Sequence, residues 1–144
     1  MIYLFLLFLL IPFGFSDTFL LCHVEGTSSL PKEPVRKFKE SISVSISEEG
    51  TRKYIDLEGS DYISETFVIK DYDGTGKDPL VKDIINSSDD TKWSIINFGE
   101  ERKLPISNHL TINRMTGMIH VRKIRGPMAT YFSGPCTKSS EKKF

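Results

Sequence analysis

Asp71, Asp73 and Asp78 are the residues whose type and spacing first suggest chemistry, because carboxylates bind divalent cations and can act as nucleophiles or proton carriers. Residues 71–76 match the start of a calcium-binding loop, but position 12 of that loop, which needs a bidentate glutamate, is Lys82. Two explanations remain open, a weak calcium contact and a solvated acidic loop, and the loop is the simpler one. We expect these three aspartates to contact a ligand or partner.

The segment VIKDYDGT, residues 68–75, is an apolar run that ends in two aspartates. It resembles the motif of haloacid-dehalogenase-type phosphatases, which place a nucleophilic aspartate and an acid/base aspartate around magnesium. This resemblance implies a metal-dependent phosphohydrolase that uses Asp71 and Asp73. That chemistry also needs a parallel sheet, crossover helices and further residues on later strands, whereas the flanks here have antiparallel β patterns. The phosphohydrolase is therefore the alternative, and turn residues that accept backbone hydrogen bonds are the expectation.

The histidines His23, His109 and His120 have no second histidine at metal-ligand spacing, and the cysteine beside His23 is better used in a disulfide. His109 and His120 are at similar distances from a predicted turn at residues 115–117, so they could lie near each other across a hairpin. No serine lies in a nucleophile elbow, and no triad can be assembled. The sequence predicts no catalytic residue, no metal site and no cofactor.

The charges balance, since Lys plus Arg and Asp plus Glu both number 19. A chain with zero formal net charge has no global field that attracts nucleic acid or an anionic membrane. Four basic residues around the last predicted hairpin either grip an anionic partner or keep an exposed face soluble. They are Arg114, Arg122, Lys123 and Arg125.

The N-terminus predicts export. Residues 1–15 are almost entirely apolar, and Gly14 and Ser16 are the small residues of a signal-peptide cleavage site after Ser16. The alternative is an uncleaved membrane anchor, but this run is shorter than the roughly 20 residues that span a bilayer as a helix. We expect a signal peptide at residues 1–16, a single β domain at residues 17–137 and a disordered tail at residues 138–144. The mature protein would be periplasmic or secreted, with no stable membrane insertion.

Cys22 and Cys136 are the only cysteines and lie near opposite ends of the mature chain. In an oxidising compartment such a pair is expected to form a disulfide, with two buried free thiols as the alternative. The bridge would tie the first strand to the last.

Alternation of apolar and polar residues predicts β-strands along most of the chain. The clearest run is SISVSIS, in which Ile42, Val44 and Ile46 share one face. The polar residues 71–91 predict a long exposed connection, with a short helix possible at residues 79–85. The predicted strands are residues 18–24, 41–47, 53–57, 62–70, 92–98, 106–114, 118–125 and 128–132.

These strands predict an all-β fold, a single antiparallel up-and-down β-barrel of seven or eight strands closed by one disulfide. A two-sheet β-sandwich is the alternative, and the barrel is favoured because most connections are short.

Three short motifs resemble those of small bacterial exported β-proteins of uncharacterised function. They are Cys-x-x-x-Gly at residues 22–26, Ile-x-Arg-x-Thr-Gly at residues 112–117 and Tyr-x-x-Gly-x-Cys at residues 131–136. The resemblance implies export and a disulfide-closed β fold rather than an activity. The chain is also similar in size and cysteine use to periplasmic lysozyme inhibitors of barrel form. We therefore expect a non-enzymatic binding or inhibitor-type module for an unknown protein or small ligand, with residues 71–91 as the contact surface.

Overall fold

The chain forms a nine-stranded antiparallel sheet in the computed structural model, which describes residues 18–49, 52–60, 63–70 and 81–139. These ranges contain no helix, and so none that could cross a membrane. The strands are β1 (Thr18–Ser29), β2 (Arg36–Glu49), β3 (Arg52–Glu58), β4 (Glu65–Lys70), β5 (Val81–Asn86), β6 (Lys92–Glu101), β7 (Leu104–Asn113), β8 (Met118–Arg125) and β9 (Met128–Ser139).

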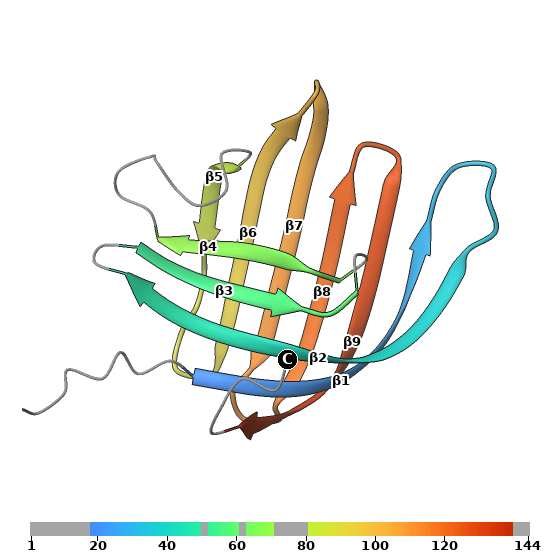
Figure 1. Cartoon of the computed structure of the whole chain (residues 1–144). Coiled ribbons are helices and arrows are strands. Elements are labelled where there is room, and N and C mark those ends of the chain that lie inside the picture. The colour runs from blue at the N-terminus through green and yellow to red at the C-terminus, as the bar shows by residue number, and fades with distance from the viewer. Residues whose placement is uncertain (1–17, 50–51, 61–62, 71–80, 140–144) are drawn as a thin grey trace, which may run out of the picture.

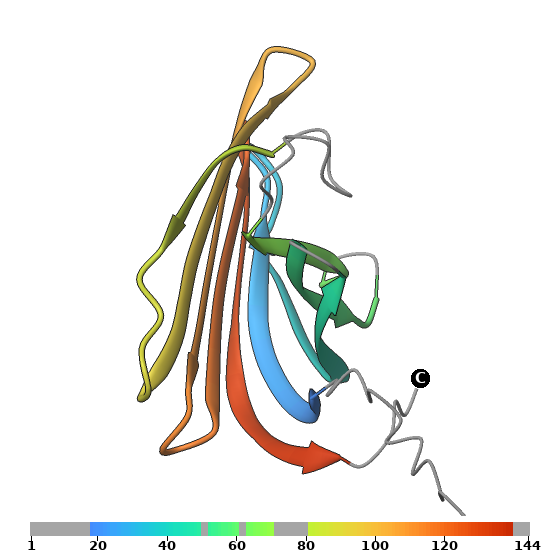
Figure 2. The same cartoon turned by 90° about the vertical axis from the view of Figure 1, so that its left-hand side faces the viewer.

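The sheet is an up-and-down meander that curls into a nearly closed barrel. Its strand order is β4-β3-β2-β1-β9-β8-β7-β6-β5, so consecutive strands pair everywhere except between β4 and β5, and β1 pairs with β9. In Figure 1, β6 to β9 run upright behind β2 to β4, which cross in front of them. Figure 2 shows that the sheet bends over through β9, β1 and β2 to form the two layers. The predicted all-β barrel is confirmed, with nine strands in place of seven or eight.

The additional strand is β5, which lies inside the region predicted as a long connection. Residues 81–86 are extended and pair with β6, so the short helix suggested for residues 79–85 is wrong over the part that the structure describes. The physical reason is Ile84, whose side chain packs against the core while its neighbours Asp83 and Ile85 point to the other face.

β1 and β9 both run further than predicted, β1 through Ser29 and β9 through Ser139. Two glycines permit this. A Cβ on Gly26 would overlap the carbonyl oxygen of Tyr131, and a Cβ on Gly134 would overlap the carbonyl oxygen of His23. Glycine in a sequence usually indicates the end of a strand, but here the missing side chains let β1 and β9 approach closely, and both strands continue past the glycines.

The first and last strands are joined covalently, since Cys22 and Cys136 are cross-strand partners and form the predicted disulfide. β9 also contains Lys138 and Ser139, which lie beyond the predicted end of the domain at residue 137. Residues 1–17 and 140–144 lie outside the described residues, so the signal peptide remains a prediction.

The core lies between the two layers and follows the predicted alternation. Leu110 and Ile112 of β7 and Ile119 and Val121 of β8 point inward, whereas their chain neighbours reach the outer face. Aliphatic and aromatic side chains of the other strands complete the core, and they are Val24, Ile42, Val44, Ile46, Ile55, Leu57, Phe67, Ile69, Ile95 and Phe132.

Candidate binding site

The two ends of the barrel differ in chemistry; each has a hollow, and the one at the end that carries the disulfide is the larger of the two. The disulfide end is the lower one in Figure 1, where β9 ends and the turn between β7 and β8 lies. We call the space there the disulfide-end hollow; its volume is about 430 Å³. It is lined by Thr18, Leu20, Ile46, Asp90, Trp93, Ile112, Asn113, Arg114, Met115, Gly117, Cys136 and Lys138.

The floor of the disulfide-end hollow is apolar because it is the end of the core. Ile46 of β2 and Ile112 of β7 are buried core residues, and Leu20, Trp93 and Cys136 pack against them while remaining partly exposed. These five residues come from five strands, and each stands at an inward position of its strand. A partly exposed apolar floor of this kind favours ligand binding, because a bound apolar ligand would shield it from water.

Two cationic side chains contact the ring of Trp93, the only tryptophan of the chain. The Lys53 Nζ lies 4.7 Å from the centroid of the Trp93 ring, and the Arg114 Cζ lies 5.5 Å from it. Lys53 is itself paired with Glu48 at 2.9 Å. These cation–π contacts fix the indole at the edge of the hollow, and the rim there also carries Asp90 and Lys138.

The opposite end of the barrel interior is polar. The Lys123 Nζ lies 3.1 Å from the Glu65 Oε2, and the two side chains are only 16% and 10% exposed. Asn108 and Thr130 are buried beside them, and the Thr130 and Ser28 hydroxyls are 3.2 Å apart. Since buried polar and charged groups are held by one another, an apolar ligand is better matched by the disulfide end.

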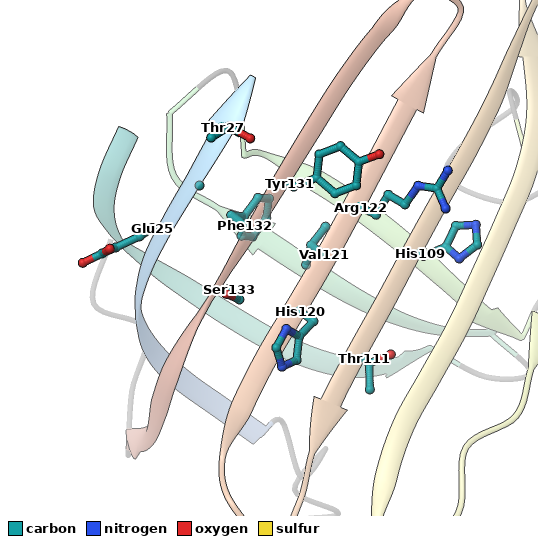
Figure 3. Close-up of a pocket in the computed structure, with 11 residues that line it drawn as sticks. Glu25, Thr27, His109, Thr111, His120, Val121, Arg122, Tyr131, Phe132 and Ser133 are labelled. Carbon is teal, nitrogen blue, oxygen red and sulfur yellow. The ribbon is translucent and has the colours of Figure 1, made fainter. Parts of the chain in front are cut away.

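A second hollow lies on the outer surface of the barrel wall, shallow and open, with a volume of about 390 Å³. We call it the outer strip. Figure 3 shows Tyr131, Arg122 and His109 side by side across β9, β8 and β7, with Thr111 and His120 on the next row. The side chains that line it are Glu25, Thr27, His109, Thr111, His120, Arg122, Tyr131 and Ser133, while Val121 and Phe132 lie behind them in the core.

His109 is the titratable group of the outer strip with a shifted pKa. Partial burial, and then the positive charge of Arg122 opposite it, hold the pKa of His109 below its ordinary value of 6.5. Its Nε2 is 3.0 Å from the Ser107 hydroxyl, and its ring meets Phe98 edge to face. His109 is therefore neutral over most of the physiological pH range.

The residues singled out in the sequence are distributed differently from the expectation. His109 is paired with Arg122 and His120 with Thr111, so the two histidines are diagonal neighbours rather than direct partners. The four basic residues do not form one cluster: Arg122 lies on the outer strip, Lys123 and Arg125 line the polar end, and Arg114 lies on the rim of the disulfide-end hollow.

Asp71, Asp73 and Asp78 lie outside the described residues. Within the described ranges, no three His, Cys, Asp or Glu side chains are grouped as metal ligands. All strand pairs there are antiparallel, which is not the parallel scaffold that phosphatases of the haloacid-dehalogenase type use.

Trp93, Leu20 and Ile46 are binding-site candidates that the sequence did not single out. Their inward direction was visible as alternation, but such positions are typical of core residues. The signal that was missed is that all three stand near the ends of their strands, where an inward side chain borders solvent.

Comparison with protein-family models, curated proteins and solved structures finds no match to this chain.

Proposed function

We propose that this chain is a non-enzymatic, exported β-barrel that binds a small apolar ligand in the disulfide-end hollow. The observation that carries the proposal is the partly exposed apolar floor of a hollow of about 430 Å³ at one end of the barrel. That volume is within the range of about 300–1,000 Å³ that small-molecule sites occupy. The rest of the barrel acts as the rigid frame of the site.

The polar opposite end supports this assignment. The Lys123–Glu65 pair and Asn108 occupy the interior there, so an apolar ligand that passed through that end would leave their charges and amide without water. A ligand that lies against Leu20, Trp93 and Ile112 meets no such penalty. The charged rim, with Arg114, Lys138 and Asp90, suits a ligand whose polar end stays in water.

Export is supported by the Cys22–Cys136 disulfide, because structural disulfides persist in oxidising compartments. It agrees with the signal peptide expected at residues 1–16, and the periplasm or the medium is the proposed location. The resemblance to small bacterial exported β-proteins and to barrel-form lysozyme inhibitors implies the same location. The proposal differs from an inhibitor in that the ligand is small and enters the barrel.

The fluorescence of Trp93 tests the proposal directly, since it is the only tryptophan. The protein is titrated with octanol and dodecanol. We expect a saturable shift of the emission to shorter wavelength, because a bound chain displaces water from the indole, and a rise of the unfolding temperature with ligand concentration. Neither a saturable emission change nor a temperature shift for any aliphatic ligand would contradict the proposal.

Leu20→Asp is the informative variant and Val35→Asp its control. Leu20 lines the hollow and is partly exposed, so a carboxylate there repels an apolar ligand without entering the centre of the core. Val35 is 57% exposed in the β1–β2 connection, away from the hollow. We expect Leu20→Asp to weaken binding by tenfold or more, while Val35→Asp binds as the wild type. Equal binding by the two variants would place the ligand elsewhere.

A further inference from the structure

We propose that the outer strip is a second, separate binding site, and that its ligand is an acidic saccharide, a sugar chain that carries carboxylates. The proposal rests on three features of the strip in the part of the chain that the structure describes: its two in-register rows of side chains, an exposed arginine without an ion-pair partner there, and a mostly polar lining.

The register places the lining side chains in two parallel rows across the strands. The first row runs His109, Arg122, Tyr131, Thr27, and the second runs Thr111, His120, Ser133, Glu25. Both rows continue onto β6, with Ile96 and Ser94, which lie outside the hollow. Neighbouring rows on one face are about 7 Å apart along the strands. The hollow lies between them, so a ligand there can contact planar groups from one row and hydroxyls from the other (Figure 3).

The strip carries a positive charge, that of Arg122, which no side chain of the described residues neutralises. Arg122 is exposed, and no Asp or Glu of the described residues lies within ion-pair distance of it. Glu25 is the only carboxylate among the described residues of the lining, and it is paired with Lys39 at 2.9 Å. The Arg122 fork is therefore available for a ligand carboxylate, which it can hold through two parallel hydrogen bonds.

Arg122 is also held in place for this role. Its Cζ lies 5.8 Å from the centroid of the Tyr131 ring, and His109 stands opposite it on β7. An arginine that stacks on an aromatic ring loses less rotamer freedom when it binds an anion.

The polar character of the remaining lining favours a sugar over a peptide. Thr27, Thr111 and Ser133 offer hydroxyls, and the Tyr131 ring is 44% exposed, a flat surface on which a sugar ring can lie. A protein partner would be expected to bury an apolar anchor in a pocket. The apolar residues beneath the strip, Val121 and Phe132, are core residues with 4% and 3% exposure, and Ile96 of β6 lies outside the hollow, so the described lining offers no aliphatic pocket.

The test uses isotope-labelled exported protein with its disulfide intact and follows backbone amide signals by NMR. The probes are the tetramers of galacturonate and mannuronate and sialyllactose, with the uncharged galactose tetramer as the matched neutral sugar. We expect at least one acidic sugar to shift the amides of β7, β8 and β9 saturably at millimolar concentration or below. The neutral tetramer is expected to bind at least tenfold more weakly.

Arg122→Gln removes the charge, and Tyr131→Ala removes the flat ring. Both residues are exposed, so the variants should fold. Each variant is expected to bind the acidic sugar at least tenfold more weakly than the wild type. Lys92→Gln, which removes one exposed charge from β6 outside the strip, is the control and should bind as the wild type.

Three outcomes would overturn the proposal. The first is that no acidic sugar binds, and the second is that Arg122→Gln binds like the wild type. The third is that a glutamate tetrapeptide or inorganic phosphate binds as tightly as the sugar, which would assign the strip to acidic peptides or to anions in general. The two proposals are tested with different ligands and different variants: acidic sugars with Arg122→Gln for the outer strip, and aliphatic alcohols with Trp93 emission and Leu20→Asp for the disulfide-end hollow. Failure of one proposal is therefore distinguishable from failure of the other.

Discussion

Among the described strands β4 and β5 do not pair, and the side chain of Asn97 bridges part of the opening between them. The sheet is open between β4 and β5, which leaves the edge of β4 facing β6. The Asn97 Oδ1 accepts a hydrogen bond from the Val68 N–H at 2.8 Å, and its Nδ2 donates one to the Val68 carbonyl at 2.9 Å. The carboxamide thus replaces one rung of the missing strand pair, and it is 1% exposed. An unpaired edge is otherwise a site of aggregation.

Replacing Asn97 by alanine should lower the free energy of unfolding by about 3 kcal/mol, because a buried donor and a buried acceptor of Val68 lose their partner. Urea unfolding measures the change. Asn86→Ala at the exposed end of β5 is the matched control: it removes one solvent-exposed hydrogen bond from the Ser88 N–H and should lower stability by about 1 kcal/mol or less. If Asn97→Ala were as stable as the control, the Val68 N–H and carbonyl would have other partners, and the contact between β4 and β6 would not depend on the Asn97 amide.

His109 gives the protein a defined response to pH. Burial and the charge of Arg122 lower its pKa in the folded state, so the unfolded chain binds more protons between that pKa and the ordinary 6.5. The free energy of unfolding therefore falls as the pH drops through about 6.5. We expect wild type to lose more stability than His109→Gln between about pH 8 and about pH 5, measured by urea unfolding at both values. Equal losses would show that His109 is not the group responsible.

At the scale of the elements, the strands of the core were predictable and the places where the chain departs from regular alternation were not. Residues 41–47 alternate strictly, as do residues 110–113 and 119–122 near the β7–β8 turn, and their apolar faces are the inner ones, as expected. Further from that turn the alternation breaks, since Asn108 and Lys123 also face the interior. β5 was missed because apolar and polar residues do not alternate in VKDIIN, where Ile84 packs against the core and the adjacent Ile85 is exposed. Local patterns favour a connection there, and only the pairing with β6 makes it a strand.

The binding-site candidates depend on register, which the sequence does not contain. That Arg122 stands between His109 and Tyr131 follows from the offsets of two strand pairs, and those are set by the turns and by core packing. The cysteine pairing was predictable because there are only two cysteines. The two glycines beside them, Gly26 and Gly134, could be noticed as motif positions, but the reason for them is the close crossing of β1 and β9.

Gly134→Ala tests that crossing. The new methyl group would overlap the His23 carbonyl, so β1 and β9 must separate locally and lose hydrogen bonds. We expect the free energy of unfolding to fall by about 3 kcal/mol, at the upper end of what overpacking costs. Gly26→Ala should act in the same direction, and Thr137→Ala, at an exposed position of β9, serves as the control. A Gly134→Ala protein within about 0.5 kcal/mol of the control would show that the strands can shift freely.

At the scale of the whole molecule, one curved sheet has an inner face with three environments and an outer face with one candidate site. Its inner face is apolar at the centre, hollow at the disulfide end and polar at the other end, where Lys123 and Glu65 pair. Its outer face carries the outer strip on β7, β8, β9 and β1. Both proposed sites therefore use the same rigid wall from opposite sides, and β1 and β9 contribute residues to both.

The disulfide should be the main constraint on the chain as a whole, because it joins the first and last strands across 114 residues of sequence. The double variant Cys22→Ser, Cys136→Ser is expected to lose about 4 kcal/mol of unfolding free energy, since its unfolded state regains the freedom of a long loop. Urea unfolding of the wild type and of the double variant, each with and without reductant, measures this loss. Reductant should destabilise the wild type and leave the double variant unchanged, so the variant controls for other effects of the reductant. Intact mass after alkylation completes the test: an oxidised protein that begins at Asp17 would establish both the bridge and the cleavage after Ser16. Two alkylated thiols, or a mass that retains Met1, would contradict the exported, disulfide-closed barrel.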